Sequence, residues 1–149
     1  MKRRLTNWIA AACMALPLTG IAATAEPVLI GLIYPTPVAD VGWAKQLDLG
    51  REAVEEAFGD RVTTRVVENI PEGPDASRVM NQLVADGAEF VVLGSFGYMN
   101  DGLRLAQRSP DVDFVHASGF RQAENFGTFT ARSYEAFYLA GMAAGMVTE

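Results

Sequence analysis

The sequence predicts an α/β fold, a doubly wound parallel sheet with helices on both faces. Two observations support this class. Short apolar runs of strand length recur along the chain, and segments with the apolar spacing of a helix separate most of them. Strands that alternate with single helices are joined by right-handed crossovers, which make neighbouring strands parallel and place the helices on the faces of the sheet.

The first half of the chain holds two strands and two helices. Val28 to Tyr34 (VLIGLIY) is nearly all apolar, which is typical of a strand covered on both faces. Residues 43–58 show amphipathic helical spacing. Residues 61–68 are more polar and β-branched, which favours a strand at the edge of the sheet. A second amphipathic helix runs from Asp75 and ends at Gly87.

The second half repeats the alternation. We expect, in order, a strand at 90–93, a loop at 94–99, a helix with Asn100 as N-cap that ends at Ser109-Pro110, strands at 112–116 and 126–130, and a final apolar helix from Ser133. In parallel sheets, ligands bind outside the carboxyl ends of the strands. The loops to consider for function are therefore 35–43, 69–74, 94–99 and 116–121.

The first 25 residues have the three parts of a secretory signal peptide. They are a basic start (Lys2, Arg3, Arg4), a short apolar run (Trp8 to Leu18) and an A-x-A cleavage signal (Ala23-Thr24-Ala25). Pro17 and Gly20 interrupt the run well before the roughly 20 apolar residues that a membrane span needs. We expect export to the periplasm and cleavage after Ala25, rather than lipid anchoring through Cys13, which would leave a very short apolar run.

Composition argues against several kinds of function. Removing residues 1–25 takes away three of the 12 basic residues and none of the 18 acidic ones, so the net charge falls from −6 to −9. Such a charge disfavours a nucleic-acid surface. The only cysteine, Cys13, lies in the leader, and the chain has a single histidine, so we expect no disulfide, metal site or cofactor.

The loop after the first strand does not fit a phosphate site. A dinucleotide fold needs G-x-G-x-x-G there, whereas residues 34–38 read YPTPV, and the two prolines remove backbone donors. Hydrolase chemistry could use Ser95, which follows the third predicted strand, and His116, which ends the fourth, because both could face the same crevice. However, the G-x-S-x-G elbow is absent, which favours a turn-capping serine and a packed histidine. We therefore expect a binding protein rather than an enzyme.

The loops at the carboxyl edge are rich in aromatic and small polar residues, namely Trp43, Phe96, Tyr98, Phe120, Asp40, Ser95 and Ser118. This set suits a small, flat, mostly neutral ligand held between rings and oriented by a few polar groups. Alternatives remain open. The aromatic residues could belong to the core, and Asp40 could be the N-cap of the first helix.

Five sequence blocks, in order, resemble the basic membrane protein family, the PnrA-like substrate-binding proteins of ABC transporters. The blocks are D-x-G-W with G-R (Asp40 to Arg51), V-E-N-x-P-E-G (Val67 to Gly73), S-F-G-Y-M (Ser95 to Met99), P-D-x-x-F-x-H-A-S-G (Pro110 to Gly119) and Y-L-A-G-x-x-A-G (Tyr138 to Gly145). The resemblance implies a type I periplasmic binding protein fold, in which two doubly wound lobes close on a ligand. It also implies delivery of that ligand to a membrane permease.

Family members bind purine nucleosides or related bases, and many carry D-x-x-F-N in the first loop. By this resemblance Asp40 matches the acid and Trp43 matches the stacking Phe, whereas Ala44 replaces the Asn. The loss of that amide makes a free base such as adenine as compatible as a nucleoside. The candidate ligand-binding residues are Trp43, Asp40, Ser95, Phe96, Tyr98 and Gly119. A receptor for a sugar or a branched amino acid on the same fold is the alternative.

The domain organisation expected from the resemblance is a signal peptide at 1–25 and the N-terminal lobe at 26–149, with the second lobe absent. One aromatic stack contributes about 1–3 kcal/mol, whereas micromolar affinity needs about 8 kcal/mol. We therefore expect a single lobe to bind weakly. The final helix would also lack its covering segment, which predicts an exposed apolar patch and self-association.

Overall fold

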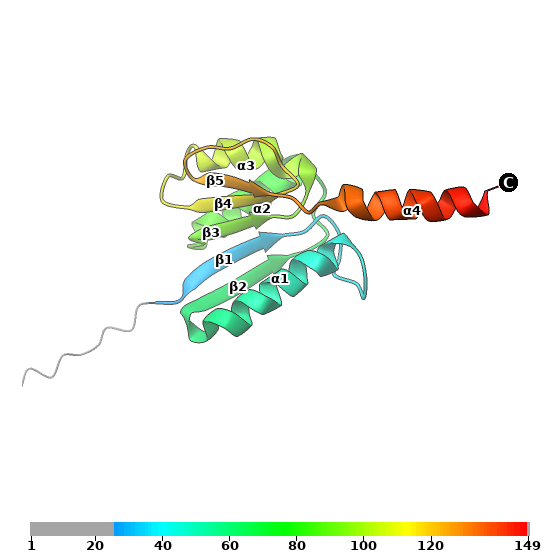
Figure 1. The fold of residues 1–149 in the computed structure, drawn as a ribbon. Coiled ribbons are helices and arrows are strands. Elements are labelled where there is room, and N and C mark those ends of the chain that lie inside the picture. Colours follow the sequence, from blue (N-terminus) through cyan, green and yellow to red (C-terminus); the bar gives the residue numbers. More distant parts are fainter. Residues whose placement is uncertain (1–25, 149) are drawn as a thin grey trace, which may run out of the picture.

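The computed structural model describes residues 26–148 and consists of one parallel sheet with flanking helices (Figure 1). The proposed signal peptide at 1–25, including Cys13, lies outside the described residues. The five strands lie in the order β2-β1-β3-β4-β5, and every pair is parallel. Their bounds are β1 Val28–Ile33, β2 Val62–Val67, β3 Phe90–Leu93, β4 Asp113–Ala117 and β5 Phe126–Phe129. The predicted fold class is confirmed, and so is the edge position of β2.

The strands end together, which brings their following loops to one edge of the sheet. Ile33 is paired with both Val67 and Leu93, and Leu93 is paired with His116. The last pair of β4 and β5 joins Ala117 to Phe129. This alignment makes the carboxyl edge the place where residues distant in sequence can form one site.

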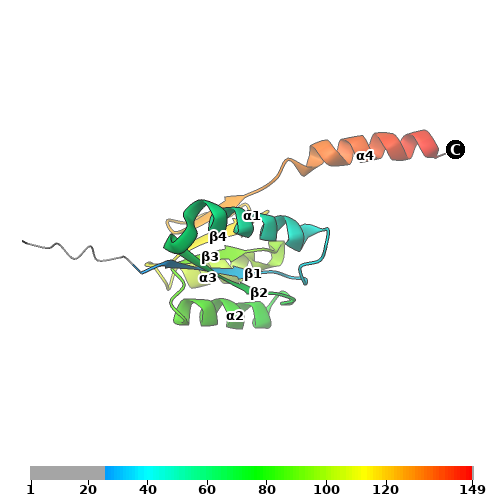
Figure 2. The ribbon, with the colours of Figure 1, turned by 90° about the horizontal axis from the view of Figure 1, so that it is seen from below.

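The helices cover both faces, as the alternation predicts. They are α1 Trp43–Phe58, α2 Pro74–Ala85, α3 Met99–Ala106 and α4 Ser133–Val147, with short 3₁₀ turns η1 Gly59–Arg61 and η2 Phe96–Tyr98. Figure 2 shows α1 on one face of the sheet and α2 with α3 on the other. The connection from β1 to β2 runs toward one edge of the sheet and the later crossovers run toward the other, so right-handed crossovers place their helices on opposite faces.

Two hydrophobic clusters hold these layers together. The larger lies between the sheet and the α2–α3 layer and includes Ile33, Val91 and Leu93 from the central strands, each fully buried. The smaller lies under α1 and centres on Leu32, Tyr34 and Ala44. Because α1 alone covers its face, strand residues such as Val115 remain only partly buried there.

One helix start differs from the sequence prediction, and one connection between parallel strands is unusually short. Asn100 is not an N-cap, because η2 continues directly into α3 and places Asn100 inside the first helical turn. The connection from β4 to β5 contains no helix, although the strands are parallel. Residues 118–125 are too few for a helical crossover. The Asn125 side-chain amide instead ties this loop to the end of α3 by bonding to the carbonyls of Ala106, Ser109 and Val112.

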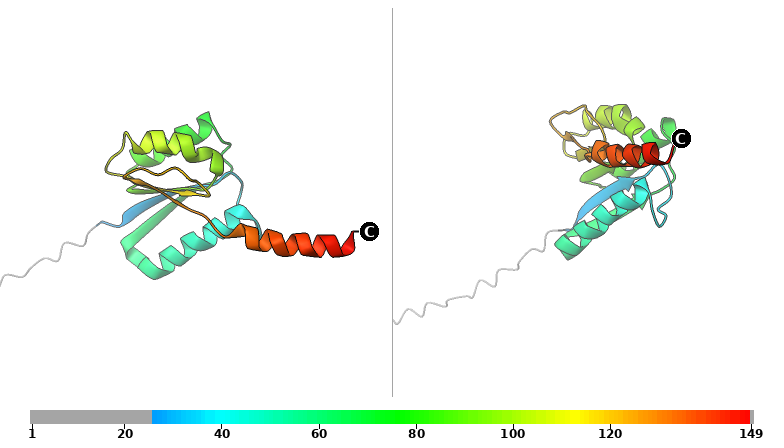
Figure 3. Two further views of the ribbon diagram at one scale, coloured as in Figure 1. Left: turned by 45° about the horizontal axis from the view of Figure 1, so that its top comes forward. Right: turned by 45° about the vertical axis from the view of Figure 1, so that its right-hand side comes forward.

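The last helix, α4, extends away from the sheet (Figure 1 and the left view of Figure 3). All its residues are exposed, including large apolar side chains such as Phe137, Tyr138 and Met146. The predicted exposed apolar patch is therefore present. Among the described residues, no helix combines the length and the apolar character needed to cross a bilayer.

Candidate functional site

Trp43 is the first residue of α1 and lies at the carboxyl edge, where 45% of its surface is exposed. Its indole Nε1–H donates a hydrogen bond to the Gly94 carbonyl at 2.5 Å, directly after β3. The ring is therefore fixed at its polar edge while much of its surface stays open to solvent. A fixed and partly exposed aromatic ring can serve as a stacking surface. A buried ring would be out of reach of a ligand, and a freely rotating ring would have to be ordered on binding.

The backbone before Trp43 requires a glycine. Gly42 is the N-cap of α1 with φ at 111°, a conformation that L side chains rarely adopt. The helix start has no side-chain cap, so Asp40 does not act as the N-cap. The Asp40 side chain is exposed and makes no hydrogen bond among the described residues. Its carboxylate remains available at this edge.

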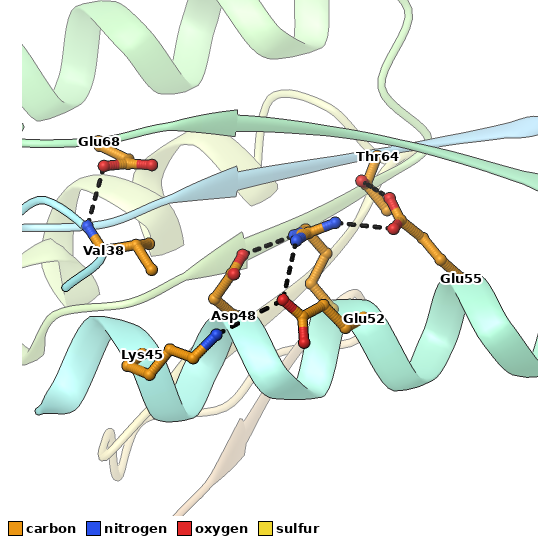
Figure 4. A network of polar contacts seen from close by, with 8 residues as sticks. Val38, Lys45, Asp48, Glu52, Glu55, Thr64 and Glu68 are labelled. Atoms are coloured by element: carbon orange, nitrogen blue, oxygen red, sulfur yellow. Dashed lines mark hydrogen bonds and ion pairs between the residues drawn. The ribbon is translucent and has the colours of Figure 1, made fainter. Parts of the chain in front are cut away.

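Glu68 fixes the loop that carries Asp40. It follows β2, and its carboxylate accepts a hydrogen bond from the Val38 backbone N–H at 2.9 Å (Figure 4). This contact ties the loop after β1 to the end of β2.

A charged network fixes α1 and therefore Trp43. Arg51 donates to Asp48 at 2.6 Å and to Glu55 at 2.7 Å, and Glu55 accepts a further bond from Thr64 on β2 (Figure 4). The Arg51 hydrogen bond holds the pKa of Asp48 below its ordinary value. The network joins the helix that begins with Trp43 to the edge strand.

Glu72 organises the loop after β3, and sequence reasoning did not single it out. Its Oε1 accepts hydrogen bonds from Ser95 Oγ at 2.6 Å and from the Gly97 backbone N–H at 2.9 Å. These two bonds lower the pKa of Glu72, and the bond from Ser95 has the larger effect. The only sequence signal was its place in V-E-N-x-P-E-G, within a loop that follows a strand.

Tyr98 differs from the expectation that its ring lines the crevice. Its side chain is fully buried in the larger cluster, and its hydroxyl donates to the Ile70 carbonyl. Burial, with a smaller effect of the Glu72 charge, raises the pKa of Tyr98 to about 12. The 3₁₀ turn of η2 directs this ring inward, so Tyr98 supports the loop rather than facing a ligand.

Phe96 and Phe120 are the rings that do face outward beside this loop. They are 56% and 72% exposed, and their centroids lie 6.3 Å apart with the planes inclined at 36°. Such a separation lies within the range of favourable aromatic pairs. Arg121, next to Phe120 in the loop after β4, donates to Asn100 at 2.9 Å and so connects the loop after β4 to α3.

His116 and Gly119 pack together rather than presenting polar groups to the crevice. His116 is fully buried, and its Nε2 lies 2.7 Å from the Ser95 carbonyl oxygen. A Cβ at Gly119 would lie 2.0 Å from His116 Nδ1, so only glycine fits there. Burial lowers the pKa of His116, which favours the neutral ring that donates to Ser95. Gly119 thus serves close packing in this structure.

The same contacts bear on the hydrolase alternative. The Ser95 hydroxyl is bonded to Glu72, and the His116 ring bonds to the Ser95 backbone carbonyl rather than to the hydroxyl. A nucleophile must share a hydrogen bond with its base through the hydroxyl. Ser95 and His116 therefore do not form a nucleophile–base pair here. Within residues 26–148, no group of three or more His, Cys, Asp or Glu side chains is placed to hold a metal ion.

Two hollows lie near these residues. One of about 230 Å³ lies beside the Trp43 ring and is also lined by Gln46, Leu47 and residues 129–131 at the end of β5. The other, about 290 Å³, lies on the sheet face under α1 and is lined mainly by apolar side chains such as Leu32, Val92 and Val115. The first adjoins the carboxyl edge, whereas the second lies along the strands and has few polar groups to orient a ligand.

Residues 27–149 match the model of one protein family, described as ABC transporter substrate-binding protein PnrA-like. The chain belongs to this family. Two curated relatives of this PnrA-like chain agree with that placement. A purine-binding protein of Brucella abortus (strain 2308) is 38% identical over 132 residues, which cover 89% of this chain and 38% of that protein. A protein named as the ABC transporter glucose-binding protein TsgA13 of Haloferax volcanii is 36% identical over 124 residues, covering 83% and 31% respectively.

This PnrA-like chain spans less than half the length of either curated relative. Its fold is similar to a transcriptional activator of the comK gene from Bacillus halodurans, with a TM-score of 0.62 and 22% identity over 81% of this chain and 41% of that one. It is also similar to a protein fragment described as a lipoprotein from Peptoclostridium difficile 630, with a TM-score of 0.60 and 17% identity. This match covers 81% of this chain and 99% of that one. At these identities the two structures show likeness of fold alone.

Proposed function

We propose that the protein is the periplasmic solute-binding component of an ABC importer and that its ligand is a purine base or nucleoside. The observation that carries this proposal is the Trp43 ring, held by its bond to Gly94 and 45% exposed at the carboxyl edge. A heterocycle can stack on such a ring without first ordering it, which lowers the entropic cost of binding. The purine-binding relative from Brucella abortus supports the choice of ligand.

The charges at this edge favour a neutral ligand over a nucleotide. Asp40 is exposed beside Trp43, and the carboxylates of Glu68 and Glu72 hold the neighbouring loops. A phosphate group would be repelled by these carboxylates, whereas the N–H groups of a purine could donate to Asp40. A free base or nucleoside fits this environment better than its phosphate.

The affinity of this chain for such a ligand should be low. Stacking on one ring contributes about 1–3 kcal/mol, and a millimolar dissociation constant already requires about 4 kcal/mol. Stacking on Trp43, a contact with Phe96 and one or two hydrogen bonds therefore lead to millimolar binding. A second lobe that closed over the ligand would add contacts to its other face. Delivery to a membrane permease and a periplasmic location are parts of the same proposal, and no catalytic step is involved.

A sugar receptor is the second candidate, favoured by the glucose-binding name of the Haloferax volcanii relative. Tryptophan can also stack on the apolar face of a sugar. However, sugar sites add charged and polar groups around the hydroxyls. Arg121 is the only arginine in loops 35–43, 69–74, 94–99 and 116–121, and it is bonded to Asn100. The purine therefore remains the better fit.

Calorimetric titration at millimolar ligand distinguishes the candidates. The panel is adenine, adenosine, guanosine, inosine, AMP and glucose. We expect saturable heat with at least one base or nucleoside, weaker binding of AMP than of adenosine, and none with glucose. Saturable heat with glucose alone would favour the sugar receptor, and no heat with any purine would refute the ligand class.

A further inference from the structure

Every residue of the loop after β3, from Ser95 to Tyr98, takes part in a hydrogen bond. The Ser95 hydroxyl is bonded to Glu72, and the Ser95 carbonyl accepts from His116. The Gly97 amide is bonded to Glu72, and the Tyr98 hydroxyl reaches Ile70. The Phe96 carbonyl accepts from the Met99 backbone N–H, while the Phe96 ring is directed outward and is 56% exposed. The loop therefore acts as a rigid support for one projecting ring.

Glu72 bonds to the residues on either side of Phe96. Its carboxylate comes from the loop before α2 and fills the space where a Gly97 side chain would be, because a Cβ there would lie 2.0 Å from Glu72 Cδ. Hydrogen bonds to an ionised acceptor are roughly twice as strong as neutral ones. The same oxygen thus fixes Ser95 and Gly97, and with them the backbone orientation of Phe96.

We propose that Glu72 is a positioning residue for ligand binding, which holds Phe96 as the second aromatic surface of the site through its bonds to Ser95 and Gly97. This inference rests on the proposed function, because Phe96 matters only if a planar ligand binds at this edge. Glu72 itself need not touch the ligand. A variant without the Glu72 carboxylate still has the Phe96 ring, but the ring can adopt other orientations. The affinity for a planar ligand is therefore lower.

The rigid support can be measured without any ligand. Amide hydrogen exchange at Gly97 reports the Glu72 bond directly in the free protein. We expect Glu72→Ala to raise this exchange rate about tenfold or more, the equivalent of losing one charge-assisted hydrogen bond. Glu72→Gln keeps an acceptor oxygen and should stay within about threefold of the unchanged protein. Glu89→Ala, at the opposite edge of the sheet, is the matched control and should leave Gly97 exchange unaltered.

The ligand arm uses adenosine and adenine as probes. We expect Glu72→Ala to weaken binding about as much as Phe96→Ala, and the double variant to be no weaker than Phe96→Ala alone, because both changes remove the same ring contact. Gly97→Ala should reproduce the loss by displacing the carboxylate, and should add little once Glu72 is already Ala. A role in stability alone predicts instead that Glu72→Ala lowers Tm but leaves the Kd of the folded protein unchanged.

Each result decides the proposal. Unchanged Gly97 exchange in Glu72→Ala overturns it whether or not a purine binds. Losses of affinity that multiply in the double variant, or a Phe96→Ala protein that binds normally, also overturn it. If neither the unchanged protein nor any variant binds adenosine or adenine, the proposed ligand class fails. The exchange measurement still shows in that case whether Glu72 fixes the loop.

Discussion

Replacing Trp43 separates its two roles, as a hydrogen-bond donor and as a stacking surface. Trp43→Phe keeps a ring at the start of α1 but removes the N–H that bonds to Gly94. Trp43→Ala removes both. A loss of affinity seen only in Trp43→Ala is therefore assigned to the ring. A loss of affinity or of stability shared by both variants is assigned to the hydrogen bond.

The structure sets the size of each effect. Gly94 is buried, so losing the Trp43 bond leaves its carbonyl without that partner and should lower the free energy of unfolding by about 1–3 kcal/mol in both variants. Stacking of about 1–3 kcal/mol corresponds to roughly 5- to 150-fold in affinity. Trp43→Ala should lose binding in that range, whereas Trp43→Phe should retain most of it.

Urea unfolding gives the free energies, and calorimetric titration with adenosine gives the affinities. Matching affinities for the unchanged protein and Trp43→Ala would refute the stacking role and leave Trp43 as a structural residue at the helix start. A large loss of affinity in Trp43→Phe with unchanged stability would instead indicate that the indole N–H serves the ligand rather than Gly94.

Three further predictions concern the scaffold. Gly94→Ala should lower the unfolding free energy by about 1–3 kcal/mol in urea titrations, because its Cβ would lie 2.7 Å from the Ile33 carbonyl oxygen; unchanged stability would contradict the close packing. The pKa of Asp48 is lowered mainly by its bond from Arg51, so this stabilisation is present at neutral pH and is lost as pH falls through the lowered pKa. Unfolding of Asp48→Asn across pH should therefore show lower stability at neutral pH and a flatter acid limb, and a parallel curve would contradict this. Deleting residues 133–149 removes the exposed apolar helix and should reduce self-association in sedimentation velocity, whereas an unchanged distribution would show that α4 does not mediate it.

The strands and helices could be predicted because their signals are local. The apolar run from Val28 gives β1, and amphipathic spacing gives α1 with the bounds Trp43–Phe58 that the structure has. Parallel order then follows from the alternation of strands and helices, and it brings Trp43 and Phe96 to the same edge. The exposure of both rings agrees with the sequence interpretation, while their contact with a ligand stays a prediction.

The internal contacts of the site could not be predicted, because they join residues far apart in sequence. Glu72 reaches Ser95 and Gly97 across 23 and 25 positions, and no periodicity reports such a contact. The direction of the Tyr98 ring depends on a single 3₁₀ turn and a hydroxyl bond to Ile70. Likewise, the role of Gly119 becomes visible only when the buried His116 ring is placed against it.

Amide chemical-shift mapping with adenosine tests the central claim most directly, because it shows where the ligand lies in this chain. We predict concentration-dependent shifts in residues 40–43, 94–97 and 118–121 at the carboxyl edge. Shifts confined to the hollow under α1, around Val92 and Val115, or no shifts at millimolar adenosine, would contradict the account.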